Sequence, residues 1–179
     1  MLFLFTWSVF RVGSRWGRAG LGAALLALAV IAAGIIRAGA PGGSLEAILD
    51  RTRPWAVGIV AMLMLCFAWT GSESLHCWRK LRRRQALGLA DPVVTNRFLV
   101  WGIGGMAGVA LCLPNIHSLL AGRAILVEPA ALSVMAGTGV LLSATWYLTF
   151  FPPAAYLRRL RRRAHAGPPA ATAGPTNLS

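Results

Sequence analysis

Acidic residues are scarce in this chain. Only 5 aspartates and glutamates stand against 18 lysines and arginines, and the formal net charge is +13 at pH 7. At the same time 56% of the 179 residues are hydrophobic. A water-soluble domain does not usually combine these values, because too few polar residues remain to cover its apolar surface. The composition therefore predicts a single membrane domain.

Cysteine and histidine are also rare, with three of each. Cys66 and Cys112 lie in apolar stretches and no cysteine spacing repeats, which excludes a disulfide framework and a zinc site. His76 and His117 fall at opposite ends of the apolar stretches, about one bilayer thickness apart, so they do not suit the two axial positions of one haem. No nucleotide-binding loop, catalytic triad or metalloprotease motif is visible in the sequence. We therefore expect no bound cofactor.

Four apolar stretches are the main positive feature. They cover about residues 19–36, 54–73, 98–115 and 131–151, and their interiors contain no charged residue. Each is close to the ~20 residues that cross the hydrocarbon core of a bilayer as a helix. The sequence thus predicts an all-α membrane protein with four transmembrane helices in a domain over residues 19–153.

Basic residues flank these stretches on alternate sides. Loops rich in lysine and arginine stay in the cytoplasm, and one side of the expected topology holds many more of them than the other. The chain is therefore predicted to be N-in/C-in, in the cytoplasmic (inner) membrane of a bacterium. The basic residues on the predicted inner side are Arg11, Arg15, Arg18, Arg79, Lys80, Arg82, Arg83, Arg84, Arg97, Arg158, Arg159, Arg161, Arg162 and Arg163, and those on the outer side are Arg37, Arg51, Arg53 and Arg123.

The positive charge itself could indicate nucleic-acid binding, but no zinc-finger, RNP or helix-turn-helix pattern accompanies it. Arginines next to spanning helices favour anionic lipid headgroups. The expected partners are the lipid bilayer with its anionic headgroups and another membrane protein or a second copy, without nucleic acid.

The two ends of the chain differ from the middle. Residues 1–18 are apolar and then basic, and Met1–Phe10 is too short to span a membrane. It is either an interfacial anchor or the end of a spanning helix whose beginning is missing, and its charge follows the apolar part, unlike a signal peptide. Pro152 and Pro153 should end or kink the fourth helix. A basic cytoplasmic helix is predicted over 154–166, and a disordered tail over 167–179.

Local signals predict where some helices begin. Asp91 followed by Pro92 indicates a helix start ahead of the third stretch. Gly88 should stop a cytoplasmic extension of the second helix. That helix is expected to begin at Pro54, with Ser44 capping only a short turn before it.

Three segments together resemble one family. They are Phe5–Arg11 (FTWSVFR), Leu87–Trp101 (LGLADPVVTNRFLVW) and Phe150–Tyr156 (FFPPAAY). These segments are similar to the C-terminal portion of uncharacterised bacterial membrane proteins with about seven helices. The resemblance covers nearly all of the chain except the tail. It implies roughly three further helices before Met1, and no activity comes with it.

The first candidate site lies where the third helix starts. Asp91, Asn96 and Arg97 are the densest polar group there and could bind a phosphorylated or otherwise anionic ligand through free backbone amides and the guanidinium. The alternative is that Asp91 caps the helix and Arg97 anchors it at the membrane surface.

A second polar cluster comprises Glu73, His76 and Lys80, which share one face at the end of the second helix. Glu-x-x-His is half of a di-iron motif, but the chain has no second copy. An ion pair of Glu73 with Lys80 or with the arginines near Arg82 is the favoured interpretation. We expect no metal site.

Small residues line one face of three of the expected helices and would permit close helix packing, either within the chain or with a partner. They are Ala19, Ala23 and Ala27, then Gly104 and Gly108, then Gly139 and Ser143. No ionisable group lies near the middle of a span, which argues against an autonomous pump. The expected function is that of a non-enzymatic accessory, scaffold or sensor-like subunit. The alternatives are a small-solute or lipid transporter component, and a membrane-lipid enzyme that uses the Asp91–Arg97 region.

Overall fold

The computed structural model describes residues 2–10, 13–39, 44–122 and 129–165. All the regular elements of this part of the chain are helices. Four of them, α2 to α5, are long and apolar enough to cross a membrane, as the sequence predicts. The predicted tail over 167–179 lies outside the described residues. The helices are α1 (Leu2–Phe10), α2 (Arg15–Ala38), α3 (Leu45–Ala86), α4 (Pro92–Leu120), α5 (Pro129–Phe150) and α6 (Ala154–His165).

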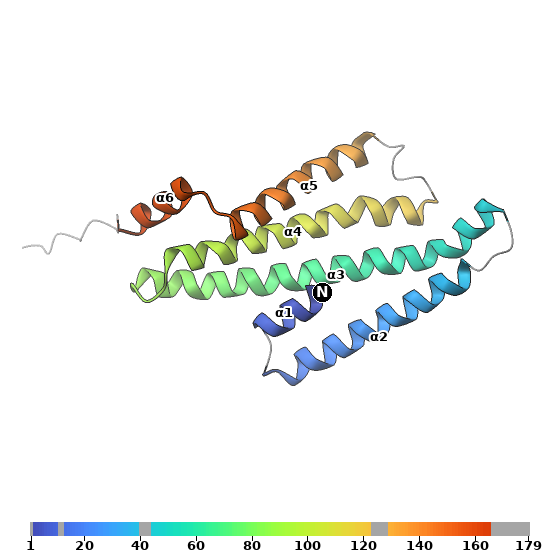
Figure 1. Ribbon diagram of the computed structural model, residues 1–179, viewed down its shortest axis with the longest axis horizontal. Coiled ribbons are helices and arrows are strands. Elements are labelled where there is room, and N and C mark those ends of the chain that lie inside the picture. The colour runs from blue at the N-terminus through green and yellow to red at the C-terminus, as the bar shows by residue number, and fades with distance from the viewer. Residues whose placement is uncertain (1, 11–12, 40–43, 123–128, 166–179) are drawn as a thin grey trace, which may run out of the picture.

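The four long helices form an open layer in the order α2, α3, α4, α5 (Figure 1). Among the described residues α3 contacts α2 and α4, whereas α5 contacts only α4. The two outer helices, α2 and α5, do not touch each other. In a closed four-helix bundle each helix would contact two neighbours around a common core. Here the layer has two free edges.

Glycines bring α3 and α4 close together in the middle of the layer. A Cβ atom added at Gly105 would lie 2.6 Å from the Cα atom of Gly71, so the two backbones are in direct contact. The ring of Phe67 occupies the space beside Gly108 in the same interface. Small residues allow this approach, which van der Waals packing then stabilises in lipid.

The outer helices attach to this pair through single glycines. Thr145 of α5 lies against Gly104, where an added Cβ would be 2.7 Å from the Thr145 Oγ1 atom. On the other side the indole of Trp55 fills the space that a Cβ at Gly34 of α2 would need. Both Gly104 and Gly108, which the sequence places on one small-residue face, therefore pack inside the chain.

The short helix α1 lies alongside α3, between α3 and α2 (Figure 1). The Thr6 hydroxyl is buried and lies 2.6 Å from the hydroxyl of Thr70, which also donates to the carbonyl oxygen of Cys66 at 2.8 Å. Polar side chains that meet between membrane helices add to their association. Thr6 thus ties α1 to α3 through a buried polar contact.

The start of α3 differs from the sequence prediction. Pro54 does not begin the helix but lies inside it, and α3 starts nine residues earlier with Ser44 as its N-cap. Ser44 caps the helix at its actual start, where its hydroxyl accepts the amide of Ala47. Pro54 lacks one backbone donor and its ring crowds the preceding turn, which bends a helix in its interior. The N-terminal end of α3 bends away from the rest of the helix in Figure 1.

We expect Gly105→Ala to destabilise the fold by about 1–3 kcal/mol, because its methyl group would force the α3 and α4 backbones apart. Gly137→Ala is the matched control, since an added Cβ there meets nothing within 4 Å. This control should be neutral or stabilising by up to about 1 kcal/mol, as glycine is a poorer helix former than alanine. Thermal unfolding in detergent micelles measures both. Equal unfolding temperatures for the two variants would contradict the glycine contact.

Candidate functional site

Basic side chains gather at one end of the layer. The end of α3, the start of α4, the turn before α2 and helix α6 all lie there (Figure 1). Arg11 and the side chain of Arg163 lie outside the described part of the chain. The basic residues of this end whose side chains are described are all exposed: Arg15, Arg18, Arg79, Lys80, Arg82, Arg83, Arg84, Arg97, Arg158, Arg159, Arg161 and Arg162. The helices thus bring together three groups of arginines that are far apart in the sequence.

Asp91 acts as the N-cap of α4. Its carboxylate accepts a hydrogen bond from the backbone amide of Val93 at 2.7 Å, and its backbone carbonyl accepts one from the hydroxyl of Thr95 at 3.0 Å. Pro92 occupies the first turn, as the sequence predicts. A side-chain cap of this kind satisfies an otherwise free amide of the helix start. Asp91 therefore has a structural role in this site.

Asn96 faces α6. Its amide nitrogen donates to the hydroxyl of Tyr156 in a short hydrogen bond. A cavity of about 210 Å³ next to this pair lies between α3, α4 and α6, and Arg82 of its lining stacks over the ring of Trp78 at 5.4 Å. The sequence pattern did not predict that Tyr156 is the partner of Asn96. The one signal for it was the position of Tyr156 on the apolar side of an otherwise arginine-rich helix.

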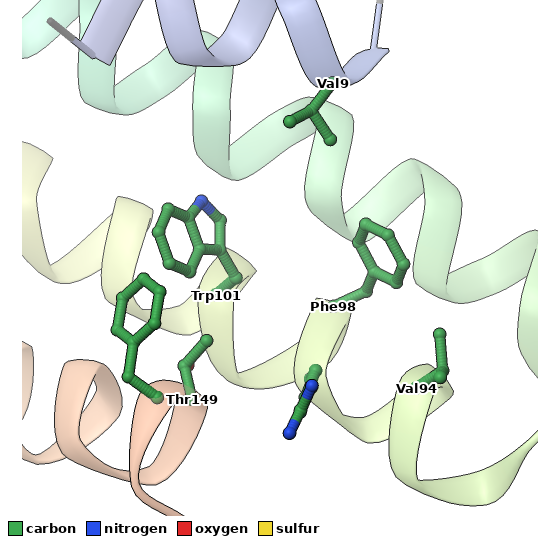
Figure 2. Close-up of a pocket in the computed structure, with 7 residues that line it drawn as sticks. Val9, Val94, Phe98, Trp101 and Thr149 are labelled. Carbon is green, nitrogen blue, oxygen red and sulfur yellow. The ribbon is translucent and has the colours of Figure 1, made fainter.

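Arg97 faces the other side of α4. It lines a separate cavity of about 290 Å³ whose remaining walls are mainly apolar (Figure 2). Consecutive residues of a helix point about 100° apart, so Asn96 and Arg97 cannot easily serve one site. The structure therefore does not bring Asp91, Asn96 and Arg97 together. The other lining residues are Val9 of α1, Val94, Phe98 and Trp101 of α4, and Thr149 and Phe150 of α5.

An aromatic cluster forms the α4–α5 wall of this cavity. The rings of Trp101 and Phe150 meet edge to face with centroids 5.5 Å apart, and Trp146 stacks on Trp101 at 6.2 Å. Such pairs stabilise a fixed ring arrangement beyond simple burial. As far as the lining is described, the cavity therefore has an apolar wall of packed rings with one cation, Arg97, beside it.

The cluster of Glu73, His76 and Lys80 is spread over the surface of α3. Glu73 and His76 line one open cavity of about 440 Å³ together with Arg79, and Glu73 also lines a neighbouring cavity of about 430 Å³ beside Trp16. Lys80 lines neither cavity. In the part of the chain that the structure describes, no three His, Cys, Asp or Glu residues lie close enough to bind a metal ion. The ion pair of Glu73 with Lys80 or Arg82 stays a prediction.

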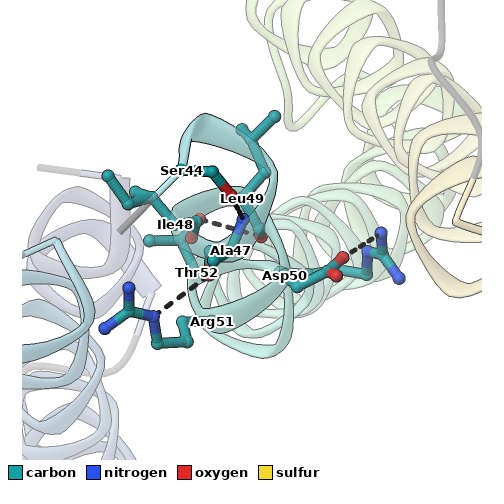
Figure 3. A network of polar contacts seen from close by, with 8 residues as sticks. Ser44, Ala47, Ile48, Leu49, Asp50, Arg51 and Thr52 are labelled. Carbon is teal, nitrogen blue, oxygen red and sulfur yellow. Dashed lines mark hydrogen bonds and ion pairs between the residues drawn. The ribbon is translucent and has the colours of Figure 1, made fainter. Parts of the chain in front are cut away.

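The opposite end of the layer carries its own polar network (Figure 3). The Ser44 hydroxyl accepts from the amide of Ala47 at 3.4 Å, and Arg53 pairs with Asp50 at 2.7 Å. The guanidinium of Arg51 donates to the carbonyl oxygen of Ala47 at 3.1 Å. These contacts are local to the first turns of α3. They stabilise the start of the helix ahead of Pro54.

We expect Tyr156→Phe to release α6 from α4, because it removes the hydroxyl that accepts from Asn96. The freed helix exposes its arginines more often, so trypsin should cleave within α6 roughly threefold to tenfold faster, in line with about 0.5–1.5 kcal/mol for one hydrogen bond. Tyr147→Phe on exposed α5 is the matched control and should cleave at the wild-type rate. Identical cleavage rates in both variants would show that the hydrogen bond does not hold α6.

Comparisons with known proteins add no functional assignment. No protein family, no curated protein and no solved structure matches this chain. Its function is therefore inferred from its own residues.

Proposed function

We propose that this protein is a non-enzymatic accessory or scaffold subunit in the inner membrane of a bacterium. The open layer is the observation that supports this most directly. Within α5, all of whose residues are described, Thr145 alone is buried, and α2 buries only Gly17, Ala24 and Gly34. Helices with so little internal contact have most of their surface available to lipid or to other helices.

The small-residue faces of the two outer helices suit a protein partner. Ala19 and Ala23 of α2 are exposed, and a Cβ added at Gly139 of α5 would meet nothing within 4 Å. Ser143, one turn from Gly139, is exposed as well. Faces of this type let a second helix approach closely. The occupant would be a helix of a partner protein or of a second copy.

The transport and lipid-enzyme alternatives have less support. Both would draw on a set of polar groups that converge on one substrate, and Asn96 and Arg97 instead face different cavities. No contact between described residues specifically supports either alternative. We therefore place them behind the subunit hypothesis.

We further propose that the arginine-rich end faces the cytoplasm, since positively charged loops are retained there. A reporter that is active only outside the cytoplasm should be active when inserted at Ser44. The same reporter at Gly88, an exposed glycine with a φ of 72° in the α3–α4 turn, should be inactive. Activity at Gly88 together with inactivity at Ser44 would reverse the proposed orientation.

The subunit hypothesis predicts a heavier complex in a native mass spectrum of the protein purified in mild detergent from its own host. Gly139→Leu should remove the bound partner, because the larger side chain blocks the small face of α5. Gly137→Leu carries the same change on the opposite side of α5 and should keep the partner. Both glycines are open in the structure, so neither change should disturb the fold.

The masses also separate the alternatives. A wild-type chain of 19.0 kDa found alone would contradict the subunit hypothesis. A subunit heavier by about three helices would instead support the resemblance to the seven-helix membrane proteins.

A further inference from the structure

The cavity beside Arg97 combines one guanidinium with apolar and aromatic walls. We propose that it binds one anionic phospholipid of the membrane leaflet at the arginine-rich end. The guanidinium of Arg97 would contact the lipid phosphate, and part of one acyl chain would lie against Phe98, Trp101 and Phe150. This proposal does not depend on the subunit hypothesis, because a bound lipid is detectable whether or not a protein partner exists.

The guanidinium of Arg97 is the part of the cavity that would recognise the lipid phosphate. Among the described residues its side chain has no ion-pair or hydrogen-bond partner, although it lies beside apolar residues. The nearest acidic residue along the helix, Asp91, already accepts the amide of Val93. Arg97 is also exposed, so its guanidinium can reach an anionic headgroup, and arginines beside spanning helices attract such lipids. Arginine also binds phosphate groups through two parallel hydrogen bonds.

The walls of the cavity favour a lipid over a soluble anion. Among the described lining residues Arg97 is the one charged residue, and the rest are apolar apart from Thr149, whose hydroxyl donates to the carbonyl oxygen of Thr145. A free phosphate would gain nothing from the rings of Phe98 and Trp101. An acyl chain gains from them by apolar contact along its length.

The cavity lies between α1, α4 and α5, where a lipid of the proposed surrounding bilayer could reach it. Val9 belongs to α1, and the other lining residues belong to α4 and α5 (Figure 2). The backbone of α1 packs against α2 and α3 in the described part of the chain, and its Val9 lines the cavity together with the residues of α4 and α5. At about 290 Å³ it is at the small end of ligand pockets, which are usually about 300–1,000 Å³. It can therefore hold a segment of one chain while the remainder stays in the bilayer.

The test is native mass spectrometry of the full chain in detergent with added phosphatidylglycerol or phosphatidylcholine of the same acyl chains. We expect one retained phosphatidylglycerol, bound about fivefold more tightly than phosphatidylcholine. This ratio corresponds to the attraction between one arginine near the membrane surface and an anionic lipid. Arg97→Gln should abolish this preference. Arg83→Gln makes the same charge change at an exposed site that lines none of the described cavities, and it should keep the preference.

A second variant tests the apolar wall. Val94→Trp keeps Arg97 but fills the cavity, and Val94 is exposed enough to accept a larger side chain. It should lose both lipids while unfolding at the wild-type temperature. Equal retention of phosphatidylglycerol by Arg97→Gln and Arg83→Gln would overturn the proposal. Displacement of the lipid preference by millimolar inorganic phosphate alone would also overturn it, because the site would then bind soluble anions.

Discussion

The backbone contact between Gly71 and Gly105 is the interaction on which the other helices depend. Apolar side chains gain little by exchanging lipid tails for another helix, so membrane helices are held by close packing and polar contacts. The α3–α4 pair achieves that packing because neither residue has a side chain at the contact. Helix α5 then attaches through Thr145 at Gly104, and α2 through Trp55 at Gly34. Without the central pair neither outer helix would have a surface to join.

Composition and spacing were sufficient to predict the four long apolar helices, because the need to satisfy the backbone in lipid leaves few alternatives. The Asp91–Pro92 helix start was also predictable from local chemistry. Which small residues pack against another helix of the chain was not predictable from the sequence. Gly104 packs against another helix of the chain, whereas a Cβ at Gly139 would meet nothing within 4 Å. The order of the helices in the layer decides which glycine faces a neighbouring helix.

The candidate site was predicted less well than the fold. Asp91, Asn96 and Arg97 are near one another in the sequence, but helical rotation directs Asn96 toward Tyr156 and Arg97 toward the aromatic wall. The partners come from α1, α5 and α6, more than 50 residues away in most cases. Sequence spacing within one helix defines a face, yet it does not reveal which distant element covers that face.

Described residues of the three segments with a family resemblance lie together at the arginine-rich end of the layer. Val9, Arg97 and Phe150 come from the three segments in turn and line the same cavity. On the other side of α4, Asn96 and Tyr156 join the last two segments again. The beginning of α4 is therefore the element around which the parts that are distant in the sequence gather.

Attachment of α5 to a single neighbour has a mechanical consequence. A helix held along one side can change its tilt without disturbing the packing of the other spans, and tilt is how membrane helices accommodate bilayers of different thickness. The α3–α4 pair, locked through its backbones, would keep its geometry. One wall of the Arg97 cavity belongs to α5 and another to α4, so the thickness of the surrounding bilayer would set the width of the cavity.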